Sequence, residues 1–223
     1  MCGRFAQISP LPRVAVRFEA VLKSGLPPRY NVAPQQKAVV VRLDLRRGIR
    51  RLEDLTWGLL PAWAAKKKDA HPLINARAET LSEKPSFKEP FARRRCLVPV
   101  DGFYEWKREG EQKIPHYFSM KDQKMFALAG LWDSFMRDKE EVVTFTIVTT
   151  AANGLMAPIH ERMPVILDPS EEAAWLDPGL ADPEVLKRYL RPFDPDRMTF
   201  CPVSPYVSNA RNEGPECIRP INE

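Results

Sequence analysis

The stretch that decides the fold runs from Cys96 to Thr150: CLVPVDGFYEWKREGEQKIPHYFSMKDQKMFALAGLWDSFMRDKEEVVTFTIVTT. Short runs of β-branched, aromatic and aliphatic residues follow one another here, separated by polar turns, which is the pattern of successive β-strands. The predicted strands cover residues 97–100, 103–107, 114–120, 125–132 and 142–149. Turns at 108–110 and 121–123 separate three of them. The stretch therefore predicts a β-rich, antiparallel core.

The flanking segments add helices and a few more strands. A helix is predicted from Ser9-Pro10, with an apolar face at Val14, Phe18, Val21 and Leu22, ending at Gly25. The remaining predicted strands cover 38–43, 52–59, 165–167 and 200–203, and the remaining helices 153–159, 171–175 and 183–189. We expect one α+β domain over residues 1–223, with a strongly curved or barrel-like antiparallel sheet and flanking helices.

Composition excludes several classes of protein. The chain is 44% hydrophobic and 28% charged, and its apolar runs are too short for a membrane span of about 20 residues. The N-terminus lacks the layout of a signal peptide, so we expect a cytoplasmic protein. Four scattered cysteines and three histidines form no metal-type spacing, so no metal and no cofactor are expected. A net charge of +5 fits a polyanionic partner.

The N-terminal sequence Met1-Cys2-Gly3-Arg4-Phe5 carries a special chemistry. Methionine aminopeptidases remove Met1 when the next residue is small, which would leave a free α-amine and a thiol on adjacent carbons of Cys2. This aminothiol condenses with an aldehyde to an imine, and the thiol then closes a thiazolidine ring. Reference pKa values of about 7.7–8.0 for the amine and about 8.5 for the thiol predict that both groups are partly nucleophilic near neutral pH. Alternatively, Cys2 has no role and the terminus is frayed.

Four polar residues at the edges of hydrophobic segments are candidates for chemistry. Asn75 and Arg77 alternate, so an extended backbone points both to one side. Glu105 lies within a predicted strand, where burial would raise its pKa and suit it to proton transfer. His160 lies in a turn and can exchange protons near neutral pH. Taken singly, each has a structural alternative: a turn cap for Asn75, a surface cation for Arg77, an ion pair with Lys107 or Arg108 for Glu105, and a structural histidine for His160.

Five motifs in order resemble one known family. They are MCGRFA at 1–6, YNVAP at 30–34, INAR at 74–77, DGFYEW at 101–106 and HERMP at 160–164, and the C-terminal PVSPYVSNARNEGPECI also matches. The resemblance is to the SRAP family, the SOS response-associated peptidases, and it runs through essentially the whole chain. It implies a single SRAP domain that captures abasic sites in single-stranded DNA through a thiazolidine at Cys2.

The resemblance also implies roles for individual residues. Cys2 would supply both nucleophiles, and Asn75 would hold the reacting terminus and the sugar. Glu105 would be the acid and base of crosslinking, and His160 would assist opening of the sugar ring and reversal. The family name implies a peptidase activity on the protein's own N-terminus, with a hydrolase or lyase character, through the same Cys2, Glu105 and His160.

For DNA, the resemblance implies that Arg4, Arg77 and Arg162 grip phosphates and that Trp106 is a wedge that excludes a continued duplex. The expected partner is therefore abasic single-stranded DNA, including junctions with duplex, bound by a monomer in the cytoplasm or, in a bacterium, at the nucleoid. The loop at 64–71 departs from an aromatic pattern, since it is lysine-rich and only Trp63 precedes it.

Two other functions fit parts of the sequence. Class II glutamine amidotransferases also begin Met-Cys-Gly, so an N-terminal cysteine hydrolase is the alternative enzyme, although the later motifs do not fit that family. In the third possibility, the protein binds single strands without covalent chemistry and Cys2 is incidental.

Overall fold

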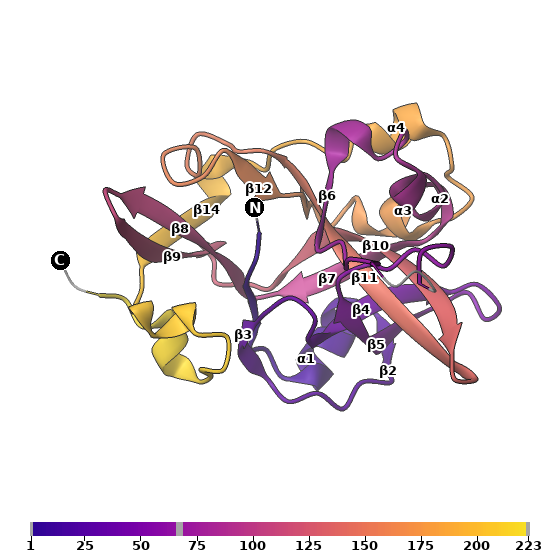
Figure 1. The fold of residues 1–223 in the computed structure, drawn as a ribbon, viewed down its shortest axis with the longest axis horizontal. Coiled ribbons are helices and arrows are strands. Elements are labelled where there is room, and N and C mark those ends of the chain that lie inside the picture. Colours follow the sequence, from indigo (N-terminus) through magenta and orange to yellow (C-terminus); the bar gives the residue numbers. More distant parts are fainter. Residues whose placement is uncertain (1, 66–68, 222–223) are drawn as a thin grey trace.

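The computed structural model describes residues 2–65 and 69–221, and its strands form two sheets that share a core (Figure 1). Within those ranges one sheet has five strands in the order β14, β9, β8, β1, β3. Their bounds are β1 Phe5–Gln7, β3 Arg29–Val32, β8 Gly102–Glu109, β9 Gln112–Met120 and β14 Met198–Pro202. The N-terminal strand β1 thus lies inside this sheet, between β8 and β3.

The larger sheet contains a closed ring. In the described part of the chain it comprises β2 Ala20–Leu22, β4 Lys37–Asp44, β5 Ile49–Trp57, β6 Asn75–Arg77, β7 Arg95–Val100, β10 Phe126–Arg137, β11 Glu140–Ala151, β12 Arg162–Pro164 and β13 Ile166–Leu167. Strands β5, β4, β7, β10 and β11 pair in succession, and β5 also pairs with β11. Because closure removes exposed strand edges, the ring is a small barrel.

The predicted curved or barrel-like core is confirmed, and so are the strands expected between Cys96 and Thr150. The pairing is not antiparallel throughout, however. The ring closes through a parallel contact, in which Thr144 and Phe145 of β11 face Thr56 and Trp57 of β5. Strands β6 and β2 are also parallel to their partners β11 and β5. A parallel pair joins segments that are distant in sequence, so a local hydrophobic pattern does not reveal it.

Alternate residues of the barrel strands face two different cores. One face, with Trp57, Phe145 and Val98, packs together with Cys2 and Phe5 from the N-terminus. The rings of Phe5 and Trp57 lie 4.8 Å apart. The other face is covered by four helices: α1 Leu11–Arg17, α2 Pro85–Arg93, α3 Glu172–Leu176 and α4 Pro183–Lys187. The N-terminal stretch is therefore part of the main core and not a frayed end.

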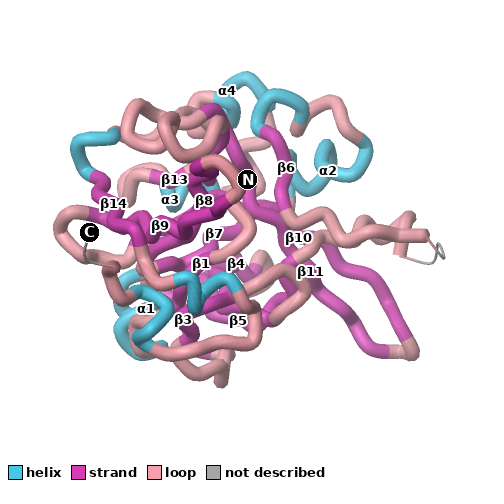
Figure 2. Tube along the Cα trace, turned by 60° about the vertical axis from the view of Figure 1, so that its left-hand side comes forward, coloured by secondary structure: helices cyan, strands magenta, loops and turns pink. Residues whose placement is uncertain are grey.

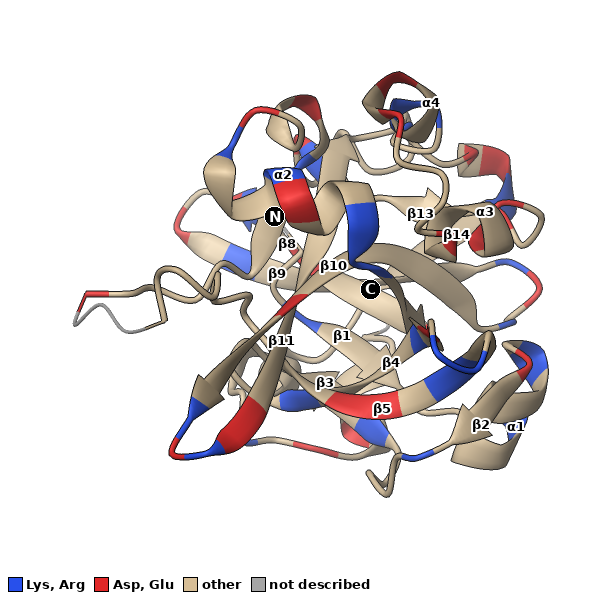
Figure 3. Cartoon of the chain, turned by 90° about the vertical axis from the view of Figure 1, so that its right-hand side faces the viewer, with Lys and Arg blue, Asp and Glu red and all other residues tan. Residues whose placement is uncertain are grey.

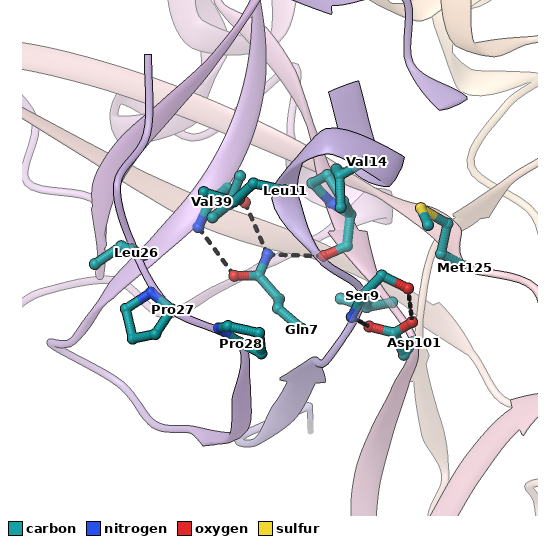
Figure 4. A pocket seen from close by; sticks show the side chains of 12 residues that line it. Gln7, Ser9, Leu11, Val14, Leu26, Pro27, Pro28, Val39, Asp101 and Met125 are labelled. Atoms are coloured by element: carbon teal, nitrogen blue, oxygen red, sulfur yellow. Dashed lines mark hydrogen bonds between the residues drawn. The ribbon is translucent and has the colours of Figure 1, made fainter. Parts of the chain in front are cut away.

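Strand β1 is fastened to the barrel by one glutamine (Figure 4). Gln7 is buried, and its amide donates to the carbonyls of Val39 (2.8 Å) and Pro99 (2.7 Å) while accepting from the Val39 N–H (2.9 Å). Its side-chain amide thus makes the hydrogen bonds that the backbone of a neighbouring strand would make, and it joins β1 to both β4 and β7. Nearby, Asp101 accepts from the Ser9 N–H (2.9 Å) and the Ser9 hydroxyl (2.5 Å). The cavity beside these residues measures about 10 Å³, room for about one water.

Three predicted helical segments differ in the structure. The first helix ends at Arg17, because Glu19 adopts a positive φ of 50°, and Val21 and Leu22 belong to the edge strand β2. The segment 153–159 forms turns and no helix, since Pro158 lacks the N–H that a helix would need there. The helices predicted at 171–175 and 183–189 are α3 and α4, each five residues long.

Strands β1, β3, β6 and β12 and helix α2 lie where no regular structure was predicted. Helix α2 begins with Pro85, a favoured residue for a first turn, and tolerates Pro90 inside it. Because of these two prolines no helix was predicted here, although Phe87 and Phe91 form an apolar helix face. Strand β6 is only three residues long and exists through its pairing with β11. Short 3₁₀ turns complete the chain: η1 Ala78–Thr80, η2 Pro195–Arg197, η3 Pro205–Ser208 and η4 Pro215–Ile218.

Two surface features complete the description. The long strands β10 and β11 extend as a hairpin beyond the rest of the molecule (Figure 2). Acidic and basic residues are interspersed on the face over β4, β5 and β11 (Figure 3), so the positive net charge is not gathered into one stripe there. None of the helices in the described ranges is long and apolar enough to cross a membrane.

Candidate functional site

The N-terminal stretch runs along β8 into the site. Phe5 pairs with Phe103 in antiparallel register, and the Tyr104 N–H donates to the Arg4 carbonyl (3.0 Å). Continuing this register brings the residues before Arg4 alongside Glu105. Gly102 permits the crossing, since a Cβ there would lie 2.3 Å from the Tyr117 ring.

Cys2 is fully buried, and its thiol differs from the expectation for a free terminus. Burial, and next the nearby Glu105 carboxylate, raise the pKa of the Cys2 thiol far above its usual range. Burial therefore favours the neutral thiol in this structure, while the prediction for the free Cys2 terminus left by loss of Met1 stays a prediction. A neutral thiol needs a base to become a nucleophile. The predicted removal of Met1 lies outside the described residues.

Asn75 contacts the N-terminal stretch directly. Its side-chain Nδ2 donates to the Cys2 carbonyl at 2.9 Å. Its Oδ1 is buried and accepts no hydrogen bond from any residue in the described ranges. Strand β6 places it there, because Asn75 and Arg77 pair with Ile147 and Thr149 of β11. Ala76 between them is buried and Arg77 is exposed, as the predicted alternation requires.

Glu105 is buried within β8, with 4% of its surface exposed. It shares a face of the strand with Phe103, which packs in the same core as Cys2. Tyr104 and Trp106 point to the opposite face and pack against the C-terminal segment. The ammonium of Lys107, the ion-pair partner considered for Glu105, lies 2.6 Å from the Glu109 carboxylate instead. Glu105 is thus a buried carboxylate whose charge acts on the Cys2 thiol.

His160 is half-buried and lies two residues before β12. Its Nδ1 accepts a hydrogen bond from the Arg162 N–H at 2.9 Å, the shorter of its two contacts, since the Arg162 carbonyl oxygen lies 3.2 Å away. A neutral ring that accepts through Nδ1 carries its proton on Nε2, so Nε2 is the donor. Strand β12 pairs with β11 at Thr149–Ala151, and β6 pairs with β11 at Ile147–Thr149, so the two pairings meet at Thr149. One strand, β11, therefore positions the segments that carry both Asn75 and His160.

The predicted phosphate-binding arginines lie in unlike settings. Arg77 is exposed. Arg4 is half-buried, and its Nη1 donates to the Asn31 Oδ1 (2.6 Å) and the Val207 carbonyl (2.8 Å). Arg162 makes a two-pronged contact with Glu79 (2.6 and 3.0 Å). Arg77 is therefore the readiest of the three to meet a phosphate, and the DNA roles of all three stay predictions.

Trp106, the predicted wedge, is half-buried. Its Nε1 donates to the Ser208 hydroxyl (3.1 Å), and the Arg4 guanidinium lies 5.7 Å from its ring centre. Trp63 is 57% exposed, as base stacking would require. The three lysines at 66–68 that follow it lie outside the described residues. Both aromatic roles stay predictions.

Sequence reasoning missed the residue that anchors Arg4. Asn31 is fully buried, and its Nδ2 donates to the carbonyls of Val207 (3.2 Å), Asn209 (3.0 Å) and Asn212 (2.8 Å). It thereby fastens the C-terminal segment to β3 and to the guanidinium beside the N-terminus. Its place inside the YNVAP motif was the available signal. A metal role was not indicated, and within the described ranges no three His, Cys, Asp or Glu side chains are placed to hold an ion.

A small closed barrel, packed against a second sheet whose strand β1 follows a buried Cys2, defines a class of protein. The model of the SOS response associated peptidase (SRAP) family matches residues 1–210, and the chain belongs to this family.

Similar proteins extend over nearly the whole chain. Abasic site processing protein YoqW of Bacillus subtilis is 43% identical over 223 residues, covering 98% of this chain and 99% of its own. Abasic site processing protein YedK of Escherichia coli is 32% identical, covering 99% and 100%. Abasic site processing protein HMCES of Rattus norvegicus is 33% identical, covering 100% and 76%. A crystal structure of a protein from Bacteroides thetaiotaomicron superimposes with a TM-score of 0.87 at 30% identity, covering 99% of this chain and 100% of that one.

Proposed function

We propose that this protein processes abasic sites in single-stranded DNA by capturing their aldehyde covalently on Cys2. Family membership and the names of similar proteins support abasic-site processing. The observation that carries the covalent chemistry is the hydrogen bond from Asn75 to the Cys2 carbonyl, made beside the buried Glu105. A chance N-terminal cysteine would need neither an anchor on its backbone nor a carboxylate beside its thiol.

The reaction balances without any other reagent. An abasic site equilibrates between a closed sugar and an open aldehyde. The α-amine of Cys2, freed by loss of Met1, adds to the aldehyde carbon, and loss of water gives an imine. The thiol then adds to the same carbon and its proton passes to the imine nitrogen. One aldehyde, one amine and one thiol thus give one thiazolidine and one water, and the protein only moves protons.

The setting of the thiol determines the order of these steps. Because burial and Glu105 keep the thiol neutral, the amine attacks first and the thiol closes the ring. In this proposal Glu105 protonates the departing hydroxyl as acid and then takes the thiol proton as base. The buried Oδ1 of Asn75 is placed to accept a hydrogen bond from the reacting amine or a sugar hydroxyl, while its Nδ2 holds the backbone.

His160 acts on the sugar in this proposal. Its Nε2 is the donor nitrogen, since Nδ1 is occupied by the Arg162 N–H. A donor of this kind can protonate the ring oxygen during opening or the leaving sulfur during reversal. Peptidase activity on the N-terminal residue would use the same Cys2, Glu105 and His160.

The strand itself would be held by phosphate contacts and stacking. Exposed Arg77 lies two residues from the Asn75 anchor, so a phosphate on it places the neighbouring sugar near Cys2. Exposed Trp63 offers an aromatic face on which a flanking base can stack, a contact worth about 1–3 kcal/mol. Trp106 would limit duplex on one side and so favour a junction.

The test is the intact mass of the purified protein, alone and after incubation with an abasic oligonucleotide. We expect the mass without Met1, and then that mass plus the oligonucleotide minus one water, stable to heat and detergent. The matched control is Cys2→Ala with the same DNA. An amidotransferase would instead hydrolyse glutamine and leave the DNA free. A non-covalent binding module would shift DNA on a native gel and lose it on a denaturing one.

A further inference from the structure

A second buried titratable residue lies beside Glu105. His116 of β9 pairs with Glu105 of β8 in the antiparallel hairpin. Directly opposed residues point to the same face of a sheet, with Cβ atoms about 4.5–5.5 Å apart. His116 has 7% of its surface exposed and Glu105 has 4%. The mechanism above makes no use of this histidine.

The His116 ring is held in one orientation. Its Nδ1 lies 3.0 Å from the Ile114 carbonyl oxygen. A carbonyl only accepts, so Nδ1 carries a proton and Nε2 of the neutral ring holds a lone pair. Phe200 of the adjoining strand β14 packs on the ring, with centroids 5.7 Å apart. The nitrogen that can gain or lose a proton is therefore Nε2.

A buried carboxyl and a buried imidazole on one face can share a proton at little cost. The pair is overall neutral whether it is a carboxylic acid with a neutral imidazole or a carboxylate with an imidazolium. Moving the proton between them therefore buries no additional net charge, whereas ionising either group alone would. Such pairs titrate together and not as separate residues.

We propose that His116 is a positioning residue for Glu105, which shares a proton with it and thereby sets the charge of Glu105 during capture. This inference rests on the proposed function of Glu105. A proton from His116 Nε2 makes Glu105 the carboxylic acid that loss of water needs, and this acid gives the proton to the departing hydroxyl. The resulting carboxylate takes the thiol proton during ring closure and passes it to the neutral His116 Nε2, which restores the starting state of the pair.

Other charged groups near His116 are few among the described residues. On the same face of β8, Lys107 and Glu109 are partners of each other at the surface. Glu109 is exposed, and its pKa is lowered mainly by Lys107, with His116 as the smallest influence on it. The residues of β14 that face this side, Phe200 and Pro202, do not titrate. Within the hairpin and its neighbouring strand, Glu105 is thus the buried titratable side chain that shares a face with His116.

The first arm of the test is an NMR titration of the histidine rings in the free protein, assigned by single His→Gln variants. If the pair shares a proton, Glu105→Gln should move the titration midpoint of His116 to lower pH, because a neighbouring carboxylate favours the imidazolium. Glu109→Gln should move it less, and His71 on the far loop should not respond. An unchanged His116 midpoint in folded Glu105→Gln would overturn the proposal.

The second arm is the crosslinking rate from pH 5 to 9 with abasic DNA in excess. His116→Phe keeps the ring packing against Phe200 but has no nitrogen, and His116→Gln keeps a polar group but no charge. We expect both to move the acidic limb of the rate profile to higher pH, because the cation that favours the Glu105 carboxylate is lost, while non-covalent affinity is kept. Wild-type profiles in both variants would overturn the proposal.

The two arms separate this inference from the proposed function. If the wild-type protein fails to crosslink, the proposed function fails, while the ring titration still decides whether His116 and Glu105 are coupled. If Glu105→Gln does not fold, the His116 variants decide alone.

Discussion

The side-chain amide of Asn75 donates a 2.9 Å hydrogen bond to the main-chain carbonyl of Cys2, across 73 residues of sequence. The hydrogen bond fixes the backbone carbonyl of the reacting residue. The amine and the thiol that react are attached to the Cα and Cβ atoms of the same residue. Because the Asn75 Oδ1 is buried and has no partner in the described ranges, the same side chain can also orient what reacts with Cys2. An aspartate there could accept but not donate, and it would lose the anchor.

Capture should depend on a free Cys2 terminus, because ring closure uses the α-amine and the thiol together. Cys2→Ala should abolish the heat-stable adduct, and Cys2→Ser should give at most an imine that borohydride can trap. An uncleavable N-terminal tag should be as damaging as Cys2→Ala although it keeps the thiol. The measurement is adduct formation on a denaturing gel. A tagged protein that crosslinks at the normal rate would rule out the thiazolidine.

Arg77→Ala should weaken binding to abasic and intact single strands alike, because a phosphate contact does not read the lesion. Each lost contact should lower the log–log salt slope by about 0.7. Fluorescence anisotropy at several salt concentrations measures both quantities. Arg93→Ala, which removes an arginine at the end of helix α2, is the matched control. An unchanged slope in Arg77→Ala would make Arg77 a surface cation.

Glu105→Gln and His160→Gln should have different effects. Proton-transfer groups contribute about 10²–10⁴-fold in rate, so Glu105→Gln should slow crosslinking by this order and leave non-covalent affinity nearly unchanged. His160→Gln should lengthen the lifetime of the adduct more than it slows its formation. Exchange of a formed adduct onto competing abasic DNA of another length reads both effects. Parallel loss of affinity and rate in Glu105→Gln would make it a binding residue.

Glu79→Gln should strengthen DNA binding if Arg162 contacts a phosphate. Glu79 holds both Nη atoms of Arg162, and a phosphate must displace it. The hydrogen bonds from Arg162 lower the pKa of Glu79. The ion pair therefore stabilises the fold at pH values above the ordinary pKa of a glutamate, and this stabilisation is lost as the pH falls through the lowered pKa of Glu79. Tighter binding with a steeper salt slope is expected. Glu83→Gln, a nearby carboxylate, is the control.

Asn31→Ala should destabilise the fold and weaken the site together. The substitution leaves the carbonyls of Val207, Asn209 and Asn212 without their buried donor, at a cost of about 1–3 kcal/mol, and frees Arg4. Urea denaturation measures the loss of stability. Protease cleavage within 204–218 measures how far the segment that holds Arg4 has been loosened. Asn209→Ala keeps the backbone carbonyl that Asn31 contacts, so it should be milder. Equal effects of both would show that Asn31 is no special anchor.

The local pattern predicted the strands from β7 to β11 because each has its own run of apolar residues bounded by turns. The closure between β5 and β11 depends on contacts between residues about 90 positions apart, which no local pattern contains. The motifs found Cys2, Asn75, Glu105 and His160 as candidates, and the structure brings Asn75 and Glu105 to Cys2. The burial of Cys2, which raises the pKa of its thiol, could not be predicted, since a reference pKa describes a solvated group. Asn31 was missed because an isolated asparagine shows nothing of its three acceptors.

The position of β1 between β3 and β8 has a consequence for synthesis. The partner of Phe5 on one side, Val32, leaves the ribosome soon after it, but the partner on the other side, Phe103, follows almost 100 residues later. At about 5–20 residues per second, that interval lasts on the order of 5–20 s. During this time one edge of β1 stays unpaired and Cys2 has no Glu105 beside it. An enzyme that trims the nascent terminus therefore has its opportunity then, before folding encloses the cysteine.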